Sequence, residues 1–401
     1  MSEEVTPTNI FTDDGTPQEN LWAKKVTNNA ILKDIFKNPF ALTDEDRSYL
    51  ESSAVVERQP ETSRRELWSY YLYYNGDNGF TMFSYLPNIL QTTAYEAGVW
   101  SNNSTLGNCL VKNNDTNAVC LIPWAGGQIP VASMVLYVQA ISFALQFVLF
   151  LCFGGLADYG KWNKYILLTA TVLGCVAQFI PAFLTQGSQW NAMMAMMILS
   201  WIGYGASLVF YAAAFPPIAD NLPAVRAARA NPKLSAQEKA AVKEKWLNHV
   251  SAISTTYSNV GFLIVTGILA IVAFAAHAYV DGAWTYFGAA PLFNNVGAGF
   301  CAVFWAINAV WYFIFIPRGR GGPPLPPNSN YITVGPKSVL RALREIRKLK
   351  MAFIYIIAYF MFADGVNTMN TMAGVVQGQI TSFNGGIVTV LNLVSAITSI
   401  L

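Results

Sequence analysis

Charged residues are scarce in this chain of 401 residues, because Asp, Glu, Lys and Arg together make up only 12% of it. Histidine occurs twice and cysteine five times, without a Cys-x-x-Cys pair or a His cluster, so no metal site is predicted. Nucleophile elbows and phosphate-binding loops are also missing, and we expect no enzyme, no cofactor and no nucleic-acid partner. Hydrophobic residues make up 53% of the chain. This composition indicates a polytopic protein of the lipid bilayer.

Eight apolar runs are long enough to cross a bilayer as helices, which takes about 20 residues. The runs are Trp68–Leu90, Val131–Ala157, Tyr165–Leu184, Ala192–Phe215, Ser251–Tyr279, Val296–Ile316, Met351–Val375 and Gly386–Leu401. The predicted fold is therefore an all-α membrane protein with about eight transmembrane helices. The last run reaches the end of the chain without a closing polar residue, from which we expect a chain that is cut off.

The Lys and Arg residues predict the orientation, because short cytoplasmic loops gather them. With residues 1–67 in the cytoplasm, every Lys and Arg between the spans lies inside except Lys112. The first 67 residues are acidic and lack an apolar period, which predicts a disordered cytoplasmic tail. Residues 68–316 would form a first six-helix half and 351–401 the start of a second. Residues 317–350 would be a cytoplasmic linker with a basic amphipathic helix.

Two aspartates, Asp77 and Asp364, are the only charged residues inside the apolar runs, and each opens the string Asp-x-x-x-Thr-Met. A carboxylate at the centre of a membrane helix costs roughly 2.5 to 3.5 kcal/mol, so it usually faces a partner or a watery cavity. The repetition favours a transporter of two related halves with its substrate site between them. Asp77, Asn78, Asp364 and Asn367 are the predicted site residues.

Two roles are open to these aspartates. A carboxylate can bind the ammonium group of an amino acid, while amide or backbone N–H groups hold the substrate's carboxylate. Alternatively, a carboxyl group in low-dielectric surroundings favours its neutral form and can couple transport to protons. A purely structural role, as a hydrogen-bond partner or cap of a neighbouring helix, is the third interpretation. The glycines beside both aspartates agree with close helix packing.

The longest predicted outer loop, Gln91–Pro130, contains acceptor patterns for N-glycosylation at Asn102, Asn103 and Asn114. The same loop contains Cys109 and Cys120. On the oxidising side of a membrane these two cysteines could form a disulfide, and the alternative is two free thiols.

The loop after the second run reads Gly-Gly-Leu-Ala-Asp-Tyr-Gly-Lys and resembles the Gly-x-Leu-Ala-Asp loop of the major facilitator superfamily. In that superfamily the Asp helps to latch one conformation. The resemblance implies a latch at Gly154 and Asp158. Tyr159 stands where the usual Arg would follow the Asp, so Lys161 or Lys164 would supply the cation.

A narrower resemblance rests on Ala358–Met369, which is similar to the Tyr-Phe-x-x-x-Asp-Gly-x-x-Thr signature of the autophagy-related vacuole effluxer family. Tyr71–Phe80 is similar to that family's first helix, although Asp77 stands where Asn or Glu is usual. Phe215–Asp220 matches the end of its fourth helix loosely.

This resemblance implies a fungal, twelve-helix transporter of the vacuolar membrane that releases amino acids to the cytosol after autophagic breakdown. A transporter of another small solute at another membrane is the alternative. A further alternative is a non-transporting membrane scaffold, if the chain ends after eight helices.

Overall fold

The computed structural model describes residues 38–40, 42–44, 47–48, 50, 59–102, 107–111, 118–280, 282–325, 330–331, 333–345 and 350–400. They fall into two compact units. The small unit joins the part of the chain up to Leu67 to Ala214–Ile253, and the large unit holds Trp68–Ala213 and Ser254–Leu401. Residues 1–37 of the predicted N-terminal tail lie outside the described residues.

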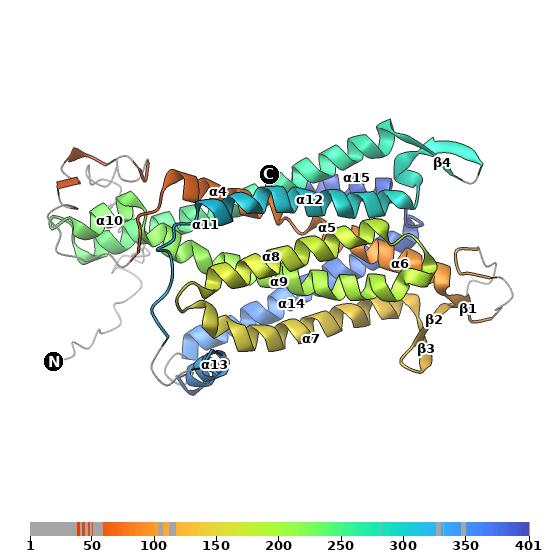
Figure 1. The fold of residues 1–401 in the computed structure, drawn as a ribbon, viewed down its shortest axis with the longest axis horizontal. Helices are drawn as coiled ribbons and strands as arrows, with labels where there is room; N and C mark the ends of the chain where they lie inside the picture. Colours follow the sequence, from red (N-terminus) through yellow and green to blue (C-terminus); the bar gives the residue numbers. More distant parts are fainter. Residues whose placement is uncertain are drawn as a thin grey trace, which may run out of the picture. The chain divides into compact units, whose positions relative to one another are not determined.

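Helices dominate both units (Figure 1). Their bounds are α4 Arg64–Gly76, α5 Phe80–Phe83, α6 Tyr85–Ala97, α7 Val131–Ala157, α8 Trp162–Phe179, α9 Trp190–Asp220, α10 Pro223–Ala230, α11 Ala236–Ala275, α12 Leu292–Phe315, α13 Val334–Glu345, α14 Lys350–Ile380 and α15 Gly385–Ile400. Short 3-10 helices cover Ile180–Phe183, Gly187–Gln189 and Phe287–Ala289.

Five helical segments in the described part of the chain are long and apolar enough to cross a membrane. They are Val131–Ala157, Trp162–Phe183, Gly187–Asp220, Ala236–Ala275 and Leu292–Phe315. These segments also expose large apolar side chains, such as Phe147 on α7 at 69%. Such surfaces suit a hydrocarbon environment, in which every backbone polar group has to be satisfied within the helix. The count of eight spans and the major facilitator arrangement stay predictions.

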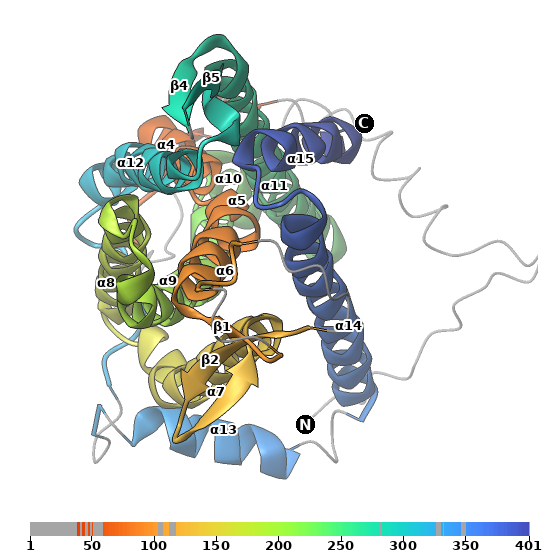
Figure 2. The same cartoon turned by 90° about the vertical axis from the view of Figure 1, so that its right-hand side faces the viewer.

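Two small antiparallel sheets lie at the end of the large unit that we call the hairpin end (Figure 2). One sheet has the order β1 Val99–Trp100, β2 Cys120–Trp124 and β3 Gly127–Pro130. The other pairs β4 His277–Val280 with β5 Ala283–Tyr286. Ala125 and Gly126 both have positive φ, which suits the two-residue turn between β2 and β3. From the sequence we predicted helices and loops here, and no strands.

The core of the large unit depends on very close helix contacts. A Cβ atom on Gly203 of α9 would lie 2.6 Å from the backbone nitrogen of Gly174 on α8, so only glycine fits. On another side of Gly174 lies the ring of Trp305 from α12, which is 2% exposed. α8 therefore packs against both α9 and α12. Small residues at crossings of this kind let helix backbones approach each other in membranes.

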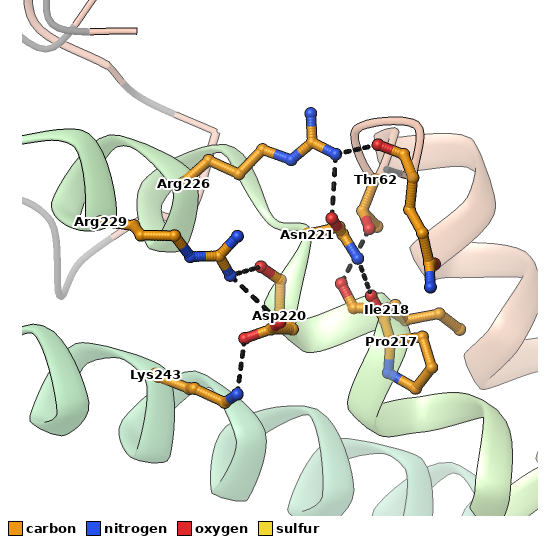
Figure 3. A network of polar contacts seen from close by, with 9 residues as sticks. Thr62, Pro217, Ile218, Asp220, Asn221, Arg226, Arg229 and Lys243 are labelled. Carbon is orange, nitrogen blue, oxygen red and sulfur yellow. Dashed lines mark hydrogen bonds and ion pairs between the residues drawn. The ribbon is translucent and has the colours of Figure 1, made fainter. Parts of the chain in front are cut away.

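The small unit is organised around the last carbonyl groups of α9 (Figure 3). Thr62 Oγ1 donates to the carbonyl oxygen of Ile218 at 2.8 Å, and Asn221 Nδ2 donates to that of Pro217 at 2.7 Å. Carbonyls at a helix end lack partners within their own helix, so these side chains satisfy them. Residues 59–67, which fall in the predicted tail, are thus placed in this unit.

Charged groups of the small unit surround Asp220 and Asn221 (Figure 3). The Asp220 carboxylate pairs with Arg229 at 3.1 Å and with Lys243 at 2.9 Å, and all three side chains are partly exposed. Pairs this exposed contribute about 0 to 1 kcal/mol each. Arg226 is 9% exposed and donates to Asn221 Oδ1 at 2.9 Å and to the carbonyl oxygen of Gln59. A buried guanidinium with these acceptors fixes residues 59–62 on α10.

α13 lies across α7 within the large unit (Figure 2). A Cβ atom on Gly335 would lie 2.2 Å from the carbonyl oxygen of Cys152, and one on Gly155 would lie 2.9 Å from the Cα of Gly335. The described helix covers the first part of the predicted amphipathic segment, whereas residues 346–349 lie outside the described residues. The predicted four-part domain division remains a prediction.

Candidate functional site at a broken helix

The first predicted span, Trp68–Leu90, is broken in the structure. α4 ends at Gly76, residues 77–79 have no helical conformation, and α5 begins at Phe80. Asn78 stabilises the break from both sides, because its Oδ1 accepts from the Phe80 backbone N–H at 3.1 Å and its Nδ2 donates to the Asn75 carbonyl at 3.2 Å. The prediction of one continuous helix was wrong here. The string Gly-Asp-Asn-Gly, which is rich in turn residues, contained the signal.

Gly79 makes the break possible for two reasons. Its φ of 75° lies in the left-handed region, which residues with a Cβ atom rarely adopt. A Cβ atom at this position would also lie 2.4 Å from the hydroxyl oxygen of Tyr204 on α9. The backbone of the break is therefore pressed against α9.

Asp77 lies inside the break and is 2% exposed. Its Oδ2 is in hydrogen-bond contact with the Ser207 hydroxyl of α9, with 2.5 Å between the two oxygens. Its Oδ1 is buried and has no hydrogen-bond partner among the described residues. A carboxylate that is only half satisfied and far from water is costly, so a cation or a proton would stabilise it strongly. This chemistry agrees with both predicted roles of the residue.

Aromatic side chains form one wall next to Asp77. The rings of Tyr70 and Tyr211 stack with centroids 4.2 Å apart, and each hydroxyl donates to the other residue's carbonyl, at 3.2 and 3.0 Å. Tyr73 also stacks on Tyr211, with ring centroids 5.1 Å apart. The phenol of Tyr74 also lies within electrostatic range of the Asp77 carboxyl group. α4 and α9 are thus joined firmly on one side of the break.

Asp364 and Asn367, the predicted partners from the second half, lie on α14. The Asn367 side chain is exposed, and the side chain of Asp364 lies outside what the structure describes. α14 approaches the first helices further along: a Cβ atom on Gly374 would lie 3.1 Å from the Phe83 carbonyl oxygen, and one on Gly378 2.6 Å from Asn88 Oδ1. The described residues thus bring α14 to α5 and α6, but they do not show Asp77 and Asp364 together.

Two buried polar residues of the large unit, Ser207 and Gln91, do not stand out in the sequence. The latter is completely buried on α6, and neither atom of its amide group has a hydrogen-bond partner within the described residues. It lies about one helical turn from Asn88 and one from Tyr95, both of which approach α14 or the loop after it. Gln91 was predicted to begin the outer loop, but α6 continues to Ala97.

The predicted latch loop follows the end of α7. The backbone N–H of Gly160 donates to the Pro323 carbonyl at 2.9 Å, and the N–H of Gly322 donates to the Gly160 carbonyl at 2.7 Å. Lys164 donates to the Phe313 carbonyl at 3.3 Å. No ion pair joins Asp158 to Lys161 or Lys164 in the described part of the chain. A Cβ atom on Gly154 would meet nothing within 4 Å. The latch role of these residues stays a prediction.

Cys109 and Cys120 form a disulfide at the hairpin end, and Cys109 donates its backbone N–H to the Tyr95 carbonyl at 2.9 Å. Asn102 lies in an exposed bend, whereas Asn103 and Asn114 fall outside the described residues. Glycosylation at these positions therefore stays a prediction. The described residues contain no group of three His, Cys, Asp or Glu that could hold a metal ion.

Comparison with known proteins identifies relatives among fungal proteins of autophagy. The Autophagy-related protein 22 of Gibberella zeae is 24% identical over 365 residues, which cover 78% of this chain and 54% of that protein. Its namesakes in Coccidioides immitis and Yarrowia lipolytica are each 23% identical, over 70% and 65% of this chain and 51% of their own length.

The chain thus spans about half the length of these relatives. No solved structure was found to match it. The family model described as "Vacuole effluxer Atg22 like" matches residues 62–401, which include the broken helix and all of the large unit from Trp68 onward. The chain therefore belongs to the family of Atg22-like vacuole effluxers.

Proposed function

We propose that this chain forms part of a transporter in the vacuolar membrane that exports amino acids to the cytosol after autophagic degradation. The observation that carries the proposal is the buried Asp77 carboxyl group at a break in the first helix. Broken helices supply substrate and ion sites in transporters that are built from two repeats. The family's description as vacuole effluxers and the names of the relatives support the same activity.

In this proposal, the substrate's ammonium group binds at Asp77. The Oδ1 atom of this residue has no hydrogen-bond partner among the described residues. A zwitterionic substrate also needs donors for its own carboxylate, and the described spans contain no Lys or Arg near the break. Neutral amide or backbone N–H groups close to Asp77 would have to supply them. The tyrosine rings beside Asp77 would contact the apolar part of the side chain.

Alternating access would expose this site to one side at a time. Towards the hairpin end, hydrogen bonds join α6 and α12 to α15 and to the loop before it: Tyr85 Oη lies 2.7 Å from Thr389 Oγ1, and Asn294 Nδ2 donates to the Phe383 carbonyl at 3.1 Å. Asn384 Nδ2 also donates to Tyr286 Oη at 2.7 Å. We infer that these contacts close the vacuolar side in the present conformation. The N-terminus would then be cytoplasmic.

Proton coupling completes the proposal, with Asp77 and Asp364 as the titrating groups. In vesicles prepared from vacuoles that carry the protein, we expect Asp77→Asn and Asp364→Asn each to abolish amino-acid release that depends on lumenal pH. Glu96→Gln is the matched control, since it removes the same charge at the hairpin end and should leave release intact. Unchanged release from Asp77→Asn would contradict the proposal. Release of labelled sugars from the same vesicles would instead identify a different substrate class.

A further inference from the structure

The hydroxyl group of Ser207 lies between two acceptor oxygens. Its oxygen is 2.5 Å from Asp77 Oδ2 and 2.7 Å from the carbonyl oxygen of Tyr204. A hydroxyl group carries one hydrogen and can donate it to only one of them. If Asp77 were ionised, the other contact would bring together two oxygens with no hydrogen between them. A second hydrogen is therefore needed for both contacts to be hydrogen bonds.

The Tyr204 carbonyl carries no hydrogen to donate, and the hydrogen of the neighbouring Tyr73 hydroxyl is already used. Thr171 Oγ1 donates to the Leu167 carbonyl at 2.7 Å, so in its 2.6 Å contact with Tyr73 Oη it has to be the acceptor. The hydrogen of Tyr73 thus points to Thr171. Consequently the missing hydrogen belongs to Asp77 itself, whose neutral carboxyl group donates to Ser207.

The groups that face Asp77 agree with this arrangement. They are the phenols of Tyr73 and Tyr74 from α4 and Tyr204 from α9, together with the thiol of Cys175 from α8. All four are neutral in their ordinary protonation state at pH 7. No Lys, Arg or His pairs with Asp77 among the described residues, and α14 carries the further carboxyl group Asp364. When no substrate is bound, a proton is therefore the cation that neutralises the Asp77 carboxylate.

We propose that Ser207 is a positioning residue that allows Asp77 to release and regain its proton, an inference that rests on the proposed proton-coupled transport. With Asp77 protonated, Ser207 donates to the Tyr204 carbonyl. When the proton passes to water on the open side, the Ser207 hydroxyl turns its hydrogen to Asp77 Oδ2. It then supplies the one hydrogen bond that the described residues offer to the ionised carboxylate. Only the O–H bond of the Asp77 carboxyl group breaks in this step, its proton passes to water, and nothing is oxidised or reduced.

Removing the hydroxyl should consequently hold Asp77 in its protonated form. Ser207→Ala deletes a hydrogen bond in both states, but the bond to the ionised carboxylate is roughly twice as strong as the bond to the neutral group. The net effect should be an about tenfold smaller acid dissociation constant of Asp77. Half of the molecules would then lose this proton at a pH about one unit higher than in the wild type. Ser207→Thr keeps the hydroxyl and should behave like the wild type. Ser200→Ala makes the same substitution at another buried serine of α9 and is the matched control.

Infrared difference spectroscopy of the full chain in lipid nanodiscs tests the proposal without requiring transport. The carbonyl band of the protonated carboxyl group that is absent from Asp77→Asn identifies Asp77. We expect this band to persist to a pH about one unit higher in Ser207→Ala, and to be unshifted in Ser207→Thr and Ser200→Ala. Circular dichroism confirms that each variant is folded.

An unshifted or downward-shifted band in Ser207→Ala would overturn the proposed switch, as would a shift of equal size in Ser200→Ala. The transport assay separates this failure from that of the proposed function. If the band shifts as expected while no pH-dependent release of amino acids occurs in vesicles, the switch stands and the transport proposal falls. If release is pH-dependent but has the same pH profile in Ser207→Ala and wild type, the transport proposal stands and the switch falls.

Discussion

Gly79→Ala is the sharpest test of the break in the first helix. An Ala at φ 75° costs about 1 to 2 kcal/mol in backbone strain. The added Cβ atom would also lie 2.4 Å from Tyr204 Oη, and forced overpacking of this kind costs about 1 to 3 kcal/mol. The expected loss in the free energy of unfolding is therefore about 2 to 5 kcal/mol.

Gly126→Ala is the matched control. Gly126 has a φ of 87°, but an added Cβ atom would meet nothing within 4 Å. Only the backbone strain of about 1 to 2 kcal/mol remains. Both substitutions reduce the freedom of the unfolded chain by a similar amount, so their difference measures the contact with Tyr204.

A double variant separates the contact from other causes. In Gly79→Ala with Tyr204→Phe the hydroxyl oxygen is absent, and the nearest ring atom to the new Cβ is Cζ at 3.0 Å. We expect this variant to recover about 1 kcal/mol of the loss. The assay is equilibrium unfolding of the full chain in mixed detergent and dodecyl sulfate micelles, followed by helical circular dichroism. Equal losses for Gly79→Ala and Gly126→Ala, or no recovery in the double variant, would refute the reasoning.

Two further predictions concern other parts of the chain and use the same unfolding assay. Thr62→Val removes the donor to the Ile218 carbonyl and should destabilise the small unit by about 1 to 3 kcal/mol, whereas Thr62→Ser should not; equal losses would argue against the capping role. Cys109→Ser should cost about 3 kcal/mol by releasing the short loop closed with Cys120, and a reducing agent should destabilise the wild type equally. If the reducing agent has no effect, the disulfide does not stabilise the protein.

Long apolar helices were predictable from the sequence. A run of apolar residues reflects the hydrocarbon core of the bilayer around the helix, and it does not depend on a particular partner in the fold. The run Val131–Ala157 has the same bounds as α7. α9 continues past its predicted end at Phe215, through Pro216 and Pro217 to Asp220. Thr62 satisfies the Ile218 carbonyl at this end of the helix, and no local pattern predicts a partner 156 positions away.

The candidate site was predictable only in part. Asp77 and Asn78 stood out because charge is rare in the apolar runs, and the structure places both at the break. Ser207 could not be found in this way, since serine is common in membrane helices and its contact with Asp77 joins residues 130 positions apart. Gln91 was missed because the first run was ended at Leu90, about two turns before the end of α6 at Ala97. The contact of Ser207 is tertiary, and a single sequence does not contain it.

The broken first helix also bears on how the protein is made. α4 and α6 have 13 residues each, which is about 20 Å of helix and too short to cross a bilayer alone. The membrane insertion machinery would therefore receive the segment as one continuous apolar stretch.

Ser207 leaves the ribosome only after 130 further residues, on the order of 10 s later. Until then the Asp77 carboxyl group has no serine to bind. The contact of the break with α9 would accordingly form late, as the fourth apolar run arrives, and biogenesis of this protein would pass through an intermediate whose candidate site is still incomplete.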